Sequence, residues 1–311
     1  MKRALLLVLG LIAALLIALP PLRSFEQGPL DDAARAAAPG RFIELEHGLV
    51  HLLESGPRDG DPVVLVHGFS VPSYVWEPLE AHLAAAGFRV VRFDLYGRGF
   101  SARPDVRYDR ALFARQLEQV MDRLQIERAH LVGLSMGGAI VSHFAATRPG
   151  RVQRVALLAP LTQARDIGAL EWPLLGEWTS RVWFLPKLAA SQMSDFVRPE
   201  RHPGWAERFQ PQMRYDGFGH AILSTLRHVM TEDSLGDFAT LGRTSRDVLL
   251  VWGRQDSVLP FAQHAAVRAA IPQARFLAVD EAGHLAHREQ PEQVAAALIT
   301  FLRGSDAAAT P

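Results

Sequence analysis

The sequence of 311 residues contains no cysteine, which excludes disulfide bonds, thiolate chemistry and metal sites with cysteine ligands. An excess of either charge is also missing, because 33 basic residues balance 33 acidic ones and the formal net charge is zero. The composition therefore gives no indication of nucleic-acid binding. Apolar residues make up 49% of the chain and charged residues 21%, which is typical of a folded globular protein. A chain of this length can form one α/β domain that carries an insertion.

Residues 4–22 lack any charge, and they follow Lys2 and Arg3. As a helix this segment would be about 28 Å long, close to the thickness of the hydrocarbon core of a bilayer. The segment does not end in a good small-x-small cleavage site, so we predict an uncleaved signal anchor over residues 1–23. The two N-terminal cations predict a membrane-anchored protein whose main body lies outside the cytoplasm, on the periplasmic or extracellular side. Secretion after cleavage of a signal peptide is the alternative.

Residues 24–41 mix proline, glycine, alanine and charged residues without an apolar period, which predicts a linker. Beyond it, short apolar runs alternate with segments of helical periodicity. Residues 61–68 (DPVVLVHG) and 129–135 (AHLVGLS) are typical of strands buried on both faces. The alternation predicts an α/β fold over residues 42–160 and 243–303, with a mostly parallel sheet flanked by helices. Residues 304–311 are predicted to be a C-terminal tail.

Residues 161–242 contain no strand-like run, yet they hold four of the six tryptophans. We interpret this segment as a helical cap inserted over the sheet. Trp172, Trp183 and Phe184 are candidate walls of a substrate pocket beneath this cap. The alternative is that these aromatic side chains form the core of the cap itself.

Residues 133–137 (GLSMG) form a G-x-S-x-G pattern between a predicted strand and a predicted helix. A sharp turn between the two requires residues without Cβ on both sides of the serine, and Gly133 and Gly137 provide them. Such a turn exposes the serine hydroxyl at the carboxyl edge of the sheet, where α/β folds bind ligands. Ser135 is therefore the predicted nucleophile.

A serine hydroxyl needs a base to activate it, and the base needs a carboxylate to hold it in one tautomer. His284 follows the last predicted strand and Asp256 ends the strand before it, so both belong to the same edge as Ser135. The oxyanion of an acyl-transfer reaction also needs preorganised donors. We assign the backbone amides of Met136 and Phe69 to this role. This chemistry requires no metal and no organic cofactor.

Five motifs together resemble the α/β-hydrolase superfamily: HGF (67–69), DLYGRGFS (94–101), GLSMGG (133–138), WGRQD (252–256) and GH (283–284). The likeness spans about residues 42–302 and is closest to esterases and monoacylglycerol-lipase-like members with an N-terminal hydrophobic anchor. It implies the α/β-hydrolase fold with an eight-stranded, mostly parallel sheet. It also implies the triad order Ser135, Asp256, His284 and a bracing role for residues 94–101.

We therefore expect a serine hydrolase that cleaves carboxylic esters with lipid-like or hydrophobic acyl groups through an acyl-enzyme. Its expected partners are a hydrophobic small-molecule ester and, through the N-terminal segment, the membrane. Hydrolysis of carbon–carbon bonds, perhydrolase or haloperoxidase-like chemistry and acyl transfer are alternatives on the same framework. A non-enzymatic scaffold is disfavoured because all three triad members are present. Dehalogenase and epoxide-hydrolase chemistry is excluded, since it requires a carboxylate where Ser135 stands. The oligomeric state stays open.

Overall fold

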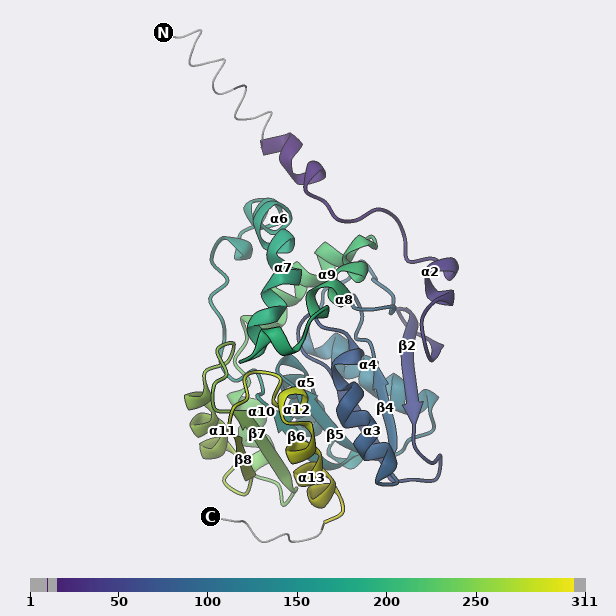
Figure 1. Cartoon of the computed structure of the whole chain (residues 1–311), viewed down its shortest axis with the longest axis vertical. Coiled ribbons are helices and arrows are strands. Elements are labelled where there is room, and N and C mark those ends of the chain that lie inside the picture. Colours follow the sequence, from purple (N-terminus) through teal and green to yellow (C-terminus); the bar gives the residue numbers. More distant parts are fainter. Residues whose placement is uncertain (1–9, 11–15, 305–311) are drawn as a thin grey trace.

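A single eight-stranded sheet lies at the centre of the computed structural model, which describes the whole chain except residues 1–9, 11–15 and 305–311 (Figure 1). In spatial order the strands are β1 (Arg41–Leu45), β2 (Gly48–Ser55), β4 (Arg89–Phe93), β3 (Pro62–Val66), β5 (Ala129–Leu134), β6 (Val152–Leu158), β7 (Val248–Gly253) and β8 (Arg275–Val279). The β1–β2 and β2–β4 pairs are antiparallel, and the remaining pairs are parallel. The predicted mostly parallel sheet is confirmed.

Helices cover both faces of this sheet (Figure 1). One group packs together on one face: α3 (Glu77–Ala85), α12 (Ala286–Glu289) and α13 (Pro291–Leu302). The other group comprises α4 (Arg110–Arg123), α5 (Met136–Thr147), α10 (Leu235–Gly242) and α11 (His264–Ala270). Because successive strand residues point to opposite faces, each central strand supplies apolar side chains to both helical layers.

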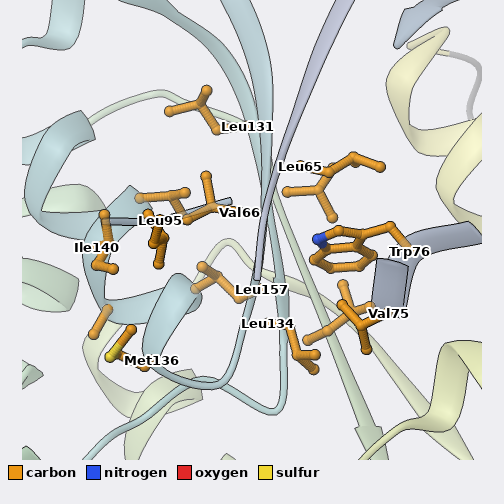
Figure 2. Packing of buried hydrophobic residues seen from close by; sticks show 14 of the residues in the cluster. Leu65, Val66, Val75, Trp76, Leu95, Leu131, Leu134, Met136, Ile140 and Leu157 are labelled. Atoms are coloured by element: carbon orange, nitrogen blue, oxygen red, sulfur yellow. The ribbon is translucent and has the colours of Figure 1, made fainter. Parts of the chain in front are cut away.

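The apolar core lies on both sides of the central strands. Figure 2 shows Leu65 facing Val75 and Trp76 on one side, while Val66 lies with Ile140 on the other. All five of these side chains are fully buried. The continuous apolar runs in the sequence therefore correspond to strands that are covered on both faces.

Between β6 and β7 the described chain contains only short helices and loops, most of which lie above the carboxyl end of the sheet (Figure 1). They are η3 (Gly168–Glu171), α6 (Leu175–Thr179), η4 (Ser180–Phe184), α7 (Leu185–Ser191), η5 (Gln192–Asp195), η6 (Pro199–Arg201), α8 (Trp205–Phe209), η7 (Gln210–Arg214), α9 (Phe218–Thr225) and η8 (Leu226–Met230). Helix α10 also falls inside the predicted cap range, but it packs against α5 and α11. The division into cap and core stays an interpretation, and "cap" below means residues 161–230.

The N-terminal segment requires a correction. Most of the predicted signal anchor, residues 1–9 and 11–15, lies outside the described residues. In the part of the chain that the structure describes, no helix combines the length and the apolar character needed to cross a membrane. The prediction of a transmembrane helix, and of the membrane-anchored localisation that was based on it, is therefore corrected: the described residues contain no such helix.

The linker predicted over residues 24–41 contains one short helix, α2 (Asp32–Ala36), which the Asp31 side chain caps by accepting from the Ala34 amide. The segment also pairs with the cap, because Gly28 forms an isolated bridge with Tyr215. Further along, residues 16–22 contact α6, where Trp178 Nε1 donates a hydrogen bond of 2.9 Å to the Leu16 carbonyl oxygen. This N-terminal segment thus lies along the cap.

Candidate active site

The turn at Ser135 connects β5 to α5 and holds the serine in a strained backbone conformation. Its φ is 54° and its ψ is −119°, values that a non-glycine residue rarely adopts. A Cβ at Gly133 would clash with the Gly137 carbonyl oxygen, and a Cβ at Gly137 would clash with the carbonyl oxygens of Val66 and His67. Both glycines are therefore required by the close approach of helix and strands, as the G-x-S-x-G pattern predicts.

Asp256 and His284 follow β7 and β8 and lie against each other. The Nδ1 atom of His284 is 2.8 Å from Oδ2 of Asp256. The other oxygen, Oδ1, accepts the backbone amides of Val258 and Leu259 at 2.9 and 2.8 Å, which fixes the orientation of the carboxylate. With Nδ1 bonded to the carboxylate, the Nε2 atom of His284 is left to act on a neighbouring group.

The electrostatics at His284 favour a basic imidazole. Burial acts to lower its pKa, but the charge of Asp256, the hydrogen bond to that carboxylate and the charge of Asp195 outweigh burial. The pKa of His284 is therefore raised above its ordinary value of 6.5. An imidazole with this environment is a stronger base than a free histidine, and its protonated form is stabilised.

The loop that carries Phe69 is held beside the nucleophile. A Cβ placed on Gly68 would lie 3.9 Å from the Ser135 hydroxyl oxygen. His67 orients this loop, since its Nδ1 lies 2.9 Å from the Gly68 carbonyl oxygen and its Nε2 accepts the Leu95 amide at 2.9 Å. Burial lowers the pKa of His67 to about 4, so the ring is neutral and Nδ1 is the donor. That bond fixes the Gly68–Phe69 peptide, whose N–H is the predicted oxyanion donor.

Residues 94–101 brace this region through two buried charged side chains. The Asp94 carboxylate accepts the amides of Ser73 at 2.9 Å and Phe100 at 3.0 Å, and it contacts His51 Nδ1 at 2.8 Å. Arg98 is fully buried, and its Nε donates to the Phe69 carbonyl oxygen at 2.8 Å. Burial lowers the pKa of Arg98 to about 9, so the guanidinium remains charged at neutral pH.

A cavity of about 270 Å³ brings the predicted site residues together. Ser135, His284 and Phe69 line it, and so does Phe184 from the cap. Further apolar lining comes from both parts of the chain: Val71, Val75, Leu134, Ile167, Leu188, Leu226, Met230, Val258, Leu259 and Leu285. A smaller polar part is formed by Ser70, Arg165, Ser191, Gln192, Ser194 and Asp195. The cavity thus has a mostly apolar lining with a smaller polar part.

Two of the predicted pocket residues lie elsewhere. Trp172 and Trp183 are 63% and 57% exposed, and neither lines the cavity. Instead, the Lys187 ammonium lies 4.7 Å from the centre of the Trp183 ring. Conversely, Asp195, which lines the cavity from η5, could not be identified from its sequence context. No motif marks this residue, because it belongs to one turn of helix in a segment without a regular apolar period.

The chain belongs to the α/β-hydrolase fold family, whose match covers residues 61–291. The observed sheet has one antiparallel edge and a strand–serine–helix turn, and this architecture is the one expected for the family. The chain is therefore an enzyme of the hydrolase class built on this fold.

Its relatives act on several kinds of bond. The dihydrolipoyllysine-residue acetyltransferase component of the acetoin cleaving system of Pseudomonas putida is 31% identical over 88% of this chain and 71% of that protein. Carboxylesterase YbfK of Bacillus subtilis is 27% identical over 85% of this chain and 87% of that protein. The 2-hydroxymuconate semialdehyde hydrolase of Pseudomonas sp. strain CF600 is 28% identical over 87% and 96%, respectively.

Among solved structures, an esterase from Thermogutta terrifontis is 26% identical and has a TM-score of 0.72, covering 86% of this chain and 99% of that one. None of these four proteins is named a monoacylglycerol lipase or described with a membrane anchor. The finer resemblance to anchored monoacylglycerol-lipase-like enzymes thus has no support from them.

Proposed function

We propose that the protein is a serine esterase that hydrolyses small carboxylic esters with an apolar acyl group. One observation carries this proposal: Ser135, in its strained turn, lines the same cavity as His284, whose Nδ1 lies 2.8 Å from the Asp256 carboxylate. In this proposal Ser135 is the nucleophile, His284 the base and Asp256 the acid of a catalytic triad. The relatives with carboxylesterase activity in their names support an ester as the substrate.

The proposed reaction has two halves. In the first, His284 Nε2 takes the Ser135 proton while the serine oxygen attacks the ester carbonyl, and the Phe69 and Met136 amides donate to the oxyanion. Met136 is the first residue of α5, so its amide has no partner within the helix. His284 then gives its proton to the leaving alcohol, and an acyl-enzyme remains. In the second half, water attacks the acyl group, His284 again relays the proton, and Ser135 is restored.

The cavity supports a preference for short to medium acyl groups. Its volume of about 270 Å³ is close to the lower end of small-molecule sites, and most of its lining is apolar. Phe184, Leu188, Leu226 and Met230 close it from the cap side. An apolar acyl chain that fills this space would gain about 25 cal/mol for each Å² removed from water.

A panel of p-nitrophenyl esters with acyl chains of two to twelve carbons tests this function on the full-length protein. We expect kcat/KM to be highest for acyl chains of about four to eight carbons. The Ser135→Ala variant should lose about 10⁴- to 10⁶-fold in kcat, because the nucleophile is absent while the fold has lost only one oxygen atom. Retained turnover in that variant would contradict the proposal.

The panel should also contain a vinylogous 1,5-diketone acid, since one relative is a 2-hydroxymuconate semialdehyde hydrolase. Cleavage of its carbon–carbon bond with a kcat/KM above that of every ester would replace the esterase proposal with C–C hydrolysis by the same residues. An unreactive ester panel together with an unreactive diketone would contradict both functions.

A further inference from the structure

The cap places one carboxyl group inside the cavity, and the triad does not use it. Asp195 lies at the end of η5 and lines the cavity together with Ser135 and His284. Its backbone is tied to the histidine loop, because the Asp195 carbonyl oxygen accepts the His284 amide at 2.9 Å and lies near the Leu285 amide at 3.4 Å. These bonds hold the Asp195 backbone beside the histidine loop.

Among the described residues, no donor forms a hydrogen bond with the Asp195 carboxyl group. The polar side chains of Ser194 and Arg165, which also line the cavity, already have other partners. Ser194 Oγ donates to the Ser191 carbonyl oxygen at 2.7 Å, and Arg165 Nη1 donates to the Val258 carbonyl oxygen at 2.9 Å. An apolar ligand in the cavity would displace water from this carboxylate without replacing its hydrogen bonds. Leaving a charged group unpaired in this way is costly.

The connection to His284 indicates which part of the substrate approaches Asp195. In acyl transfer by a serine enzyme, the histidine delivers its proton to the leaving oxygen, so the alcohol portion of the ester lies on the histidine side. Leu188 of α7 and Leu226 and Met230 of η8 contribute apolar lining that suits the acyl chain. Asp195, whose backbone is bonded to the histidine loop, is therefore expected to lie on the alcohol side.

We propose that Asp195 is a specificity-determining residue that accepts a hydrogen bond from a hydroxyl or protonated amino group on the alcohol portion of the ester. This inference rests on the proposed esterase function and assigns a substrate class to it: esters of polyols or amino alcohols. A substrate with such a donor satisfies the carboxylate when water leaves, whereas a simple alkyl ester does not.

The titration of Asp195 gives this preference a pH dependence. Burial raises the pKa of Asp195 to about 6, the charge of Asp256 acts in the same direction, and His284 opposes it. Arg165 is the other charged group that lines the cavity. Below pH 6 the carboxyl group becomes neutral, so its attraction for a cationic alcohol should disappear. Protonation of His284 slows all esters alike and cancels in a ratio of two substrates.

Three butyrate esters with one acyl group test the proposal: propyl, 2,3-dihydroxypropyl and 3-(dimethylamino)propyl butyrate. We expect wild-type kcat/KM to be at least 10-fold higher for the two donor-bearing esters than for propyl butyrate at pH 7.5. The Asp195→Ala variant should reduce both ratios about 10- to 100-fold, the range for a hydrogen bond to a charged group. The Asp195→Asn variant keeps an acceptor, so it should lose the preference for the amino ester but only part of the preference for the dihydroxy ester.

Glu200→Gln is the matched control, because Glu200 is an exposed cap carboxylate that does not line the cavity. Its substrate ratios should stay within twofold of wild type. In the wild type, the amino-ester ratio should fall as pH drops from 7.5 to 5, and it should be flat in Asp195→Asn. Thermal melting of each variant shows that the fold is retained.

Equal ratios in wild type and Asp195→Ala would overturn the proposal, and so would a wild-type ratio near one. Both outcomes leave the esterase function intact, since all three esters are then still hydrolysed. If wild type hydrolyses none of the esters in either panel, it is the proposed function itself that fails.

Discussion

At the scale of single residues, Asp94 shows how a buried charge is stabilised in this fold. It is buried, and it accepts the Ser73 and Phe100 amides besides its contact with His51. Burial acts to raise the pKa of Asp94, but the hydrogen bond and charge of His51 outweigh it and hold the pKa well below 3.8. Burial likewise acts to lower the pKa of His51, but the hydrogen bond and charge of Asp94 raise it above 6.5.

We expect Asp94→Asn to lower the free energy of unfolding by about 3 kcal/mol, since it leaves a buried histidine without its counter-charge. The depressed pKa of Asp94 means that its contribution is present above pH 3.8 and is lost as pH falls toward its folded-state pKa. The raised pKa of His51 means that its contribution is full below pH 6.5 and is lost as pH rises through its folded-state pKa. Urea unfolding from pH 3 to 9 should show the largest difference between wild type and variant at about pH 4 to 6.5.

Asp105→Asn is the control for that measurement, because the Asp105 side chain is fully exposed. Its free energy of unfolding should differ from wild type by less than about 0.5 kcal/mol. A difference for Asp94→Asn that is small, or constant across the pH range, would contradict the role given to the Asp94–His51 pair.

At the scale of elements, the turn between β5 and α5 depends on glycine for space. A methyl group at Gly137 would meet the carbonyl oxygens of Val66 and His67, which belong to β3 and to the loop that leads to Phe69. Backbone atoms cannot move aside as a flexible side chain can. Gly137→Ala should therefore both destabilise the fold by about 1–3 kcal/mol and displace the Phe69 loop.

The measurements for Gly137→Ala are urea unfolding and esterase kinetics. We expect kcat to fall at least 10-fold at temperatures where the variant is still folded, because the Phe69 amide, the proposed oxyanion donor, would move. Gly150→Ala is the comparison, since a Cβ at Gly150 meets nothing within 4 Å. Wild-type kcat in a folded Gly137→Ala variant would show that the turn tolerates the extra atom.

At the scale of the whole molecule, the cap is tied to the loops that carry the site. The Glu289 carboxylate accepts the Gly283 amide at 2.6 Å and the Val197 amide at 2.8 Å, so one side chain connects the histidine loop to the cap. On the other side, Gln212 accepts the Gly99 amide at 2.9 Å and donates to the Ser70 carbonyl oxygen at 3.2 Å. The cap is therefore connected by hydrogen bonds to the loops around the candidate site.

Glu289→Ala should release this connection without unfolding the molecule. We expect faster hydrogen exchange at the amides of residues 196–198 and 283–285, together with a several-fold loss in kcat. Glu292→Ala, which removes an exposed carboxylate from the start of α13, should change neither. Unchanged exchange in Glu289→Ala would mean that other contacts hold the cap.

The sheet and the residues at its carboxyl edge could be predicted from the sequence. Ser135, Asp256 and His284 each follow a strand of the sheet, and parallel strands place the residues that follow them at one edge. The helices of the cap could not be predicted in the same way, because they are mostly one or two turns long. An apolar period cannot be recognised over so few residues, so Trp172 and Trp183 were assigned to the pocket and Asp195 was overlooked. The apolar N-terminal run likewise suggested a membrane span that the described structure does not contain.

The central claim is that Ser135, His284 and Asp256 act as one unit on an acyl-type centre. A fluorophosphonate probe tests it directly, with the labelled residue identified by mass spectrometry and the labelling rate measured against pH. We predict one adduct per chain at Ser135, a rate that rises with pH through an ionisation above 6.5, and labelling at least 10³-fold slower in His284→Ala. An adduct on another residue, or an equal rate in His284→Ala, would contradict the account.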